Sequence, residues 1–126
     1  MRHARRRLLI SLRPEYAEEI YAGRKHYEFR RVRMRVEPGE VVVIYETLPV
    51  GAVTGEFTIA KVVFGGTELA GLERSKRRAE AAAEYLAGAR AATALKVSSP
   101  RRYRRKRRLA DVGLSRAPQS YCWLDR

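Results

Sequence analysis

A lysine, a glutamate and an arginine lie close together in the sequence, as Lys25, Glu28 and Arg30. Two cations beside one carboxylate leave a local excess of positive charge. Such a group suits a phosphate or another anionic oxygen, because charge-assisted hydrogen bonds to such oxygens are strong. Glu28 can orient the two cations or accept a hydrogen bond from the amino group of a base. The alternative interpretation is a surface salt-bridge cluster on an edge strand, which binds nothing.

The residues around this group predict how it is positioned. The preceding segment has the pattern of a helix that begins near Pro14. Gly23 suits the end of that helix, because a left-handed residue after the last turn is least costly for glycine. Tyr27 and Phe29 then alternate with Glu28 and Arg30, as in a half-buried strand. We therefore expect Glu28 and Arg30 on one face of this strand and the two aromatic rings on the other.

Lys25 and Glu28 are also the candidate catalytic residues. A lysine held in a pocket can act as a base or a nucleophile. Glu28 beside it favours the protonated ammonium, which opposes nucleophilic use. The sequence has no recognisable Ser-His-Asp arrangement, phosphate-binding loop or zinc-ligand spacing. We predict no metal and no cofactor, and catalysis stays an open alternative.

The charge of the chain predicts a polyanionic partner. The 126 residues have a formal net charge of +13, and 22 of the 27 basic residues are arginine. Arginine pairs with phosphate through a planar fork and stacks on bases, so nucleic acid is the leading candidate. An anionic membrane surface is a weaker one, because no amphipathic helix combines a wide apolar face with a basic face. The alternative is arginine enrichment from a biased genome or a hot habitat.

The pattern of elements predicts one domain, residues 1–126, with a basic arm at residues 1–7. We expect strands at 8–12, 27–30, 41–45, 52–64, 94–97 and 121–124, and helices after Pro14, at 67–72 and at 76–86. Gly55 marks a bulge in the long fourth strand. The pattern indicates a mostly β α+β fold, in which five or six strands form a small barrel with flanking helices.

The order glycine, any residue, lysine, two residues, glutamate, any residue, arginine resembles the signature of the ASCH domain, a PUA-like β-barrel family. Here Gly23, Lys25, Glu28 and Arg30 fill it. Residues 10–17 resemble the opening strand and helix of the family, and residues 117–121 resemble its closing segment. The resemblance extends over most of the chain, from about Leu8 to Leu124, and implies a PUA-like barrel that binds RNA.

The resemblance also implies a hydrolase as an alternative. Some small ASCH proteins are amidohydrolases that deacetylate acetylated cytidine, and one is a ribonuclease. Lys25 matches the lysine of the amidohydrolases. Those enzymes have a threonine three positions later, where this chain has Glu28, and this departure argues against the amidohydrolase activity.

Further basic and aromatic residues are predicted to contact a bound strand. In the family's arrangement, Tyr45 and the loop 46–51 lie at the mouth of the barrel. Tyr103 can stack on a base, or it is a core or rim tyrosine. The basic residues expected to follow the phosphate backbone include Arg31, Arg33, Arg101, Arg102, Arg104 and Arg105. The alternative for the block 101–108 is a solvated loop that binds nothing specific.

These observations favour an RNA-binding PUA-like module with a basic nucleotide or phosphate pocket, acting in RNA metabolism or translation-linked regulation. The first alternative is an RNA- or nucleoside-processing hydrolase that uses Lys25. The second is an interaction protein of a ribonucleoprotein without pocket chemistry.

The lone cysteine, Cys122, is expected to be a small buried residue rather than a nucleophile. No run is apolar enough to span a bilayer, so we expect a cytoplasmic protein without a membrane partner.

Overall fold

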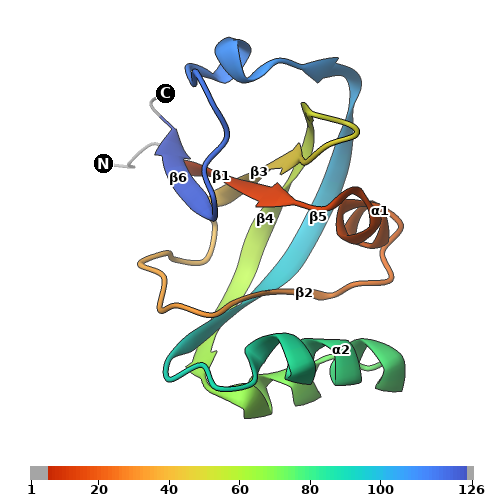
Figure 1. Ribbon diagram of the computed structural model, residues 1–126, viewed down its shortest axis with the longest axis vertical. Helices are drawn as coiled ribbons and strands as arrows, with labels where there is room; N and C mark the ends of the chain where they lie inside the picture. Colours follow the sequence, from red (N-terminus) through yellow and green to blue (C-terminus); the bar gives the residue numbers. More distant parts are fainter. Residues whose placement is uncertain (1–5, 125–126) are drawn as a thin grey trace.

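Strands dominate the computed structural model, which describes residues 6–124 (Figure 1). The strands are β1 (Arg7–Leu12), β2 (Tyr27–Arg30), β3 (Val41–Glu46), β4 (Ala52–Gly65), β5 (Ala92–Arg107) and β6 (Tyr121–Leu124). The helices are α1 (Pro14–Tyr21) and α2 (Lys76–Leu86), with 3-10 turns η1 (Thr67–Leu72) and η2 (Leu109–Val112). The structure confirms the predicted mostly β α+β fold with flanking helices.

The six strands form one curled sheet in the order β2-β5-β4-β3-β1-β6. β1 pairs with β3 in parallel, and the other neighbours are antiparallel. β4 and β5 are long and bend through several register shifts, one of which lies between Val53 and Gly55 as the sequence predicted. The sheet is a half-barrel whose two edges are β2 and β6.

β5 is much longer than the predicted strand at 94–97, and this corrects the interpretation of the basic block. Residues 101–107 belong to β5, so the alternative of a solvated loop is wrong. Val53, Gly55 and Glu56 of β4 pair with this segment, which satisfies its backbone. Long arginine side chains can keep their charged ends in water while the backbone joins a sheet. A run of cations therefore does not exclude a strand.

Three groups of apolar side chains fill the two faces of the sheet. Along β3, Val42 and Ile44 point into the half-barrel, where they pack with Leu8, Ile10 and Leu95. Val41 and Val43 point to the outer face and pack with Leu9, Val53 and Tyr103. A further cluster, which includes Phe29, Ala94, Leu69 and Leu86, joins β2 and β5 to η1 and α2. The half-barrel thus has an inner face and an outer face, and apolar side chains pack on both.

The predicted basic arm is only partly described. Arg2 and Arg5 lie outside the described residues. Arg7 already begins β1, and Arg6 pairs with Glu40 and lies 4.0 Å from the ring centre of Trp123. Arg7 is therefore part of the sheet, and Arg6 packs against it through Glu40 and Trp123. Within residues 6–124, no helix has the length and apolar character that crossing a membrane requires.

Candidate functional site

The corner between α1 and β2 positions the signature residues. α1 ends at Tyr21, and Gly23 has a φ of 78°, the left-handed conformation predicted for it. In β2, Phe29 packs toward α2 with Ala94. Glu28 is paired with Leu95, whose side chain lies in the half-barrel. The predicted alternation is confirmed, and it places Glu28 and Arg30 on the inner face.

Glu28 holds the two signature cations together. Its Oε1 lies 3.6 Å from Nζ of Lys25, and its Oε2 lies 3.0 Å from Nε of Arg30. The exposed fractions of the three side chains are 15% for Lys25, 6% for Glu28 and 8% for Arg30. The Lys25 ammonium also donates to the carbonyl of Tyr27. The prediction of a cluster at an edge strand is right, but the cluster is buried, so the surface interpretation is wrong.

Arg30 joins the two edges of the half-barrel. Its Nη1 donates to the hydroxyl of Ser120, just before β6, at 3.3 Å, and its Nη2 donates to the carbonyl of Ser11 at 3.2 Å. The backbone N–H of Ser11 donates to the carbonyl of Ser120, so these segments are also tied to each other. Arg30 thus bridges β2 to the β1–β6 side of the sheet. Each of its Nη atoms donates to one of these partners and its Nε lies beside Glu28, which suits a positioning role rather than a direct phosphate contact.

Glu73 also contacts the start of β2, and the sequence analysis missed it. Its side chain is 2% exposed, and its Oε2 accepts a hydrogen bond from the N–H of Tyr27 at 3.2 Å. Nδ1 of His26 lies 3.9 Å from its Oε1. Glu73 comes from the segment between η1 and α2, far from β2 in the sequence. No local pattern reveals such a contact.

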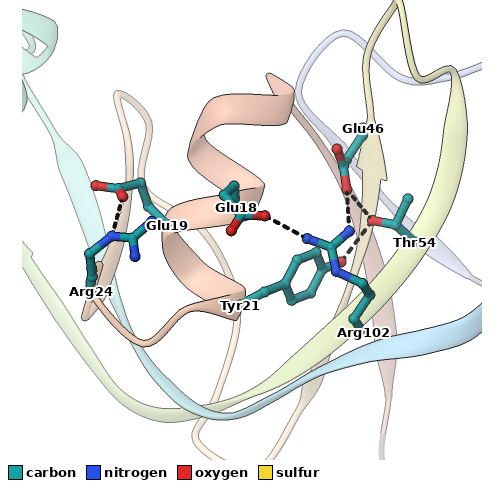
Figure 2. A network of polar contacts seen from close by, with 7 residues as sticks. All are labelled: Glu18, Glu19, Tyr21, Arg24, Glu46, Thr54 and Arg102. Carbon is teal, nitrogen blue, oxygen red and sulfur yellow. Dashed lines mark hydrogen bonds and ion pairs between the residues drawn. The ribbon is translucent and has the colours of Figure 1, made fainter.

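A second polar network lies where α1 meets β3, β4 and β5 (Figure 2). The hydroxyl of Thr54 donates to Glu46 at 2.7 Å and lies 2.8 Å from the hydroxyl of Tyr21. Because Thr54 has a single hydroxyl proton, Tyr21 is the donor to Thr54. Arg102 contacts Glu46 at 3.5 Å and Glu18 at 2.9 Å, and its guanidinium lies 4.3 Å from the ring centre of Tyr21.

This network changes the interpretation of Arg102. The sequence analysis placed Arg102 with the residues that contact phosphate. In the structure, two carboxylates and the Tyr21 ring engage its guanidinium, and Glu46 is buried. Arg102 therefore ties β5 to α1 and β3.

We expect Tyr21 to contribute to the stability of the protein at alkaline pH. Burial raises the pKa of Tyr21 to about 12, above its usual value of 10.0. The neutral phenol therefore contributes stability that is present below pH 10 and is lost as the pH rises through 12. We expect Tyr21→Phe to cost about 1 kcal/mol near neutral pH, because Thr54 loses a donor. The deficit relative to wild type should shrink between pH 10 and 12, as measured by denaturant unfolding; a pH-independent deficit would contradict this account.

The other predicted basic residues lie in different environments. Arg31 donates to the carbonyls of Tyr85 and Ala87 at the end of α2, at 2.7 and 2.9 Å. This contact pairs carbonyls at the C-terminal end of the helix, and the positive charge of Arg31 interacts favourably with the helix dipole there. The Arg33 guanidinium lies 3.9 Å from the ring centre of Phe64, and Arg101 pairs with Glu56 at 3.4 Å.

Arg104 and Arg105 differ from those residues. Both are exposed. Within residues 6–124, neither forms an ion pair with a carboxylate. Among the residues predicted to contact the phosphate backbone of a nucleic acid, these two have the greatest freedom to bind an external anion.

The two predicted aromatic contacts lie on the outer face. Tyr45 packs against the cluster of Leu9, Val43 and Tyr103, on the face opposite Glu46. It does not lie with Glu28 and Arg30 on the inner face, and its place at the mouth of the barrel stays a prediction. Tyr103 is 7% exposed, and its hydroxyl donates to Glu56 at 2.7 Å. The core interpretation of Tyr103 is right, and its buried ring has no free face for a base.

Comparisons with known proteins show which fold and family this chain is similar to. The ASCH domain matches residues 10–108. The structure is similar to the crystal structure of ASCH from Zymomonas mobilis, with a TM-score of 0.81 and 29% identity over 98% of this chain and 90% of that one. A variant of that protein with a tyrosine changed to phenylalanine aligns with a TM-score of 0.79 and 28% identity over 97% of this chain and 92% of that one.

A more distant similarity concerns the fold alone. The N-terminal domain of Staphylothermus marinus McrB aligns with a TM-score of 0.57 and 9% identity, over 86% of this chain and 81% of that one. No curated protein matches the chain significantly. The family match covers well over half of the chain, including every signature residue. The chain therefore belongs to the ASCH domain family, which has a PUA-like fold.

Proposed function

We propose that this ASCH protein binds RNA through the cationic half of β5. The observation that carries the proposal is the segment 101–107, in which six of seven residues are cations and only Tyr103 is buried. Arg101 and Arg102 are paired with carboxylates, so the cations at 104–107 supply the charge without an ion pair among the described residues, over roughly 13 Å at about 3.3 Å per residue. A rigid row of cations suits a polymer of phosphates, because neutralising them releases bound counterions.

The choice of RNA over DNA rests on the family. ASCH and other PUA-like domains are associated with RNA binding. The charge of the chain supports any nucleic acid, whereas a role in RNA metabolism or translation-linked regulation follows only from the family. The test therefore has to include both polymers.

Within this proposal, Lys25 is the signature residue that contacts a nucleotide. Its side chain is the most exposed of the three, at 15%. Glu28 and Arg30 are more deeply buried and hold one another, so they act as positioning residues. The ammonium can offer a donor to a phosphate or a base oxygen at the edge of the cluster.

The proposal predicts a steep dependence of RNA affinity on salt. Each phosphate that is neutralised should contribute about −0.7 to −0.9 to the slope of log K against log salt. Replacing Arg104, Arg105 and Lys106 together by glutamine should flatten the slope by about 2, because up to three contacts are lost. Filter binding or fluorescence anisotropy at several salt concentrations measures both slopes. Affinity that does not change with salt would exclude the proposed binding mode.

Hydrolysis is the second candidate, favoured by a continuous chain of polar contacts. Lys25 contacts Glu28, Glu28 contacts Arg30, and Arg30 contacts the hydroxyl of Ser120. An amine, a carboxylate and a hydroxyl in one cluster can supply general acid or base groups. In the Zymomonas protein, structures exist of variants that lack a tyrosine hydroxyl or a serine hydroxyl.

Turnover separates this candidate from simple binding. Purified protein should be incubated with RNA and with acetylated cytidine, and the products followed by chromatography. An enzyme that uses Lys25 would lose its activity in Lys25→Ala while remaining folded. Binding without turnover of either substrate supports the RNA-binding proposal. RNA binding that survives Lys25→Ala and depends only on the β5 cations would instead indicate an interaction protein without pocket chemistry.

A further inference from the structure

A cavity of about 340 Å³ lies on the outer face of the sheet, away from the signature cluster. Arg7 of β1 and Arg107 of β5 line it, together with the turn that contains Asp111. From Arg7 to Ser11, where Arg30 is bound, β1 advances by about 13 Å. The cavity is therefore a separate place from the Lys25 site.

One of the two arginines of the cavity lies close to a buried tyrosine. The Arg107 guanidinium is 3.9 Å from the ring centre of Tyr103. Arg7 lines the same cavity, and burial raises the pKa of Tyr103. Within residues 6–124, Arg7 and Arg107 form no ion pair. By contrast, their chain neighbours Arg6 and Arg108 do. Two neighbouring cations without a carboxylate partner repel each other, and a bound anion would relieve that repulsion.

The carboxylate in the cavity wall forms its ion pair with Arg108 rather than with Arg7 or Arg107. Asp111 is held by Arg108, whose Nη2 lies 3.1 Å from Oδ1 and whose backbone N–H donates to Oδ2 at 2.8 Å. The hydrogen bond from Arg108 holds the pKa of Asp111 below its usual value, so it stays paired with Arg108. Within residues 6–124, Arg7 and Arg107 have no carboxylate at ion-pair distance, although the charge of Arg107 also acts on Asp111.

Three aliphatic side chains supply the apolar part of the wall. Val112, Leu114 and Leu124 line the cavity beside the two cations. Its volume is in the range of small-molecule sites, about 300–1,000 Å³, and exceeds what a bare phosphate needs. A nucleotide combines the two required chemistries, because it has an anionic phosphate and a base with apolar faces.

We propose that this cavity holds one nucleotide of a bound RNA strand, with its phosphate between Arg7 and Arg107 and its base against Val112, Leu114 and Leu124. The inference rests on the proposed RNA binding and names where the strand goes. Arg107 is the last residue of β5, so a strand that follows the cations of β5 reaches the cavity at the end of that path.

Trp123, the single tryptophan of the chain, is one of the lining residues, and its ring also packs against Arg6, so its fluorescence is followed together with titration calorimetry. Adenosine monophosphate should change the Trp123 fluorescence in a saturable way. Adenosine, which lacks the phosphate, should bind at least tenfold more weakly. Inorganic phosphate should bind more weakly than the nucleotide as well; if it accounts for the full affinity, the cavity is an anion site and the nucleotide assignment is wrong.

The double variant Arg7→Gln and Arg107→Gln should lose at least tenfold in affinity for adenosine monophosphate. The charge-matched control is Lys76→Gln with Arg77→Gln, on exposed positions of α2, and it should bind as wild type does. Since Arg7 is partly buried, Arg107→Gln alone, at an exposed position, serves as the second variant if the double variant fails to fold. Equal losses in the cavity variant and the control would overturn the assignment.

RNA titration distinguishes failure of this inference from failure of the proposed function. If RNA binds with the expected salt dependence but adenosine monophosphate leaves Trp123 unchanged, the cavity assignment fails and RNA binding stands. If the nucleotide binds at the cavity and RNA does not bind, the proposed function fails and the protein has a free-nucleotide site. If neither binds, both are wrong.

Discussion

Glu28→Gln should lower the free energy of unfolding by about 3–5 kcal/mol, the range seen when one partner of a buried ion pair is removed. The carboxylate of Glu28 is 6% exposed and lies between Lys25 and Arg30. Without it, two cations face each other with little water to screen them. Arg30 also bridges the two edges of the half-barrel, so the loss should spread to the contacts with Ser11 and Ser120.

Denaturant unfolding of wild type and Glu28→Gln measures this effect. The matched control is Glu84→Gln on α2, at an exposed position, where we expect a change within about 0.5 kcal/mol. In the double variant Glu28→Gln with Lys25→Gln, one of the two unpaired cations is gone, so part of the stability should return. A Glu28→Gln protein as stable as the control would show that the cluster is solvated rather than buried.

Gly55→Ala should destabilise the protein by about 3 kcal/mol, at the upper end of the cost of overpacking. A β-carbon at position 55 would lie 2.3 Å from the carbonyl oxygen of Arg101 and 2.5 Å from the hydroxyl of Tyr21. The first contact is with backbone, which cannot rotate away. The strands β4 and β5 would have to separate where Arg102 and Tyr21 meet, so the network in Figure 2 should be lost with the packing.

Gly71→Ala is the control for this substitution. A β-carbon there meets no atom within 4 Å, so the substitution creates no clash. It should be neutral or slightly stabilising, because alanine lowers the conformational entropy of the unfolded chain. Thermal unfolding of both variants compares them under identical conditions. If the two substitutions have the same effect on stability, β4 and β5 do not approach each other closely enough at Gly55 for a β-carbon to clash.

Much of the fold follows from local patterns in the sequence. Gly23 predicted the end of α1 because few other residues adopt its conformation without strain. The helix predicted at 76–86 is α2, and the hydroxyl of Ser75 just before it accepts a hydrogen bond from the N–H of Arg78. The continuous β-branched run at 41–44 predicted the core strand β3. Each of these signals is read within a few neighbouring residues.

The contacts that complete the site are not local, and for that reason the sequence could not predict them. Arg30 meets Ser120 across 90 positions, and Tyr21 meets Thr54 across 33. The sequence pointed to Ser120 only as part of the closing segment of the family resemblance. The extent of β5 was missed because its partner strand, rather than its own composition, supplies the pairing.

Cys122 is half-buried, and burial raises the pKa of its thiol, which opposes a nucleophilic role as expected.

The most direct test of RNA binding through β5 compares two triple variants of equal charge. One replaces Arg104, Arg105 and Lys106 of β5 by glutamine; the other replaces Arg74, Lys76 and Arg77, which are exposed at or near the start of α2. Figure 1 shows α2 at the opposite end of the molecule from the second half of β5. Each variant removes three of the 27 basic residues, so non-specific attraction falls equally in both.

The measurement is the affinity for a single-stranded RNA, and for a DNA of the same sequence, at two salt concentrations. We predict that the β5 variant loses at least tenfold in RNA affinity and has a flatter salt slope, while the α2 variant stays close to wild type. RNA should also bind more tightly than DNA to the wild-type protein. Equal losses in the two variants would contradict the central claim, because binding would then depend on net charge alone and not on the cationic strand.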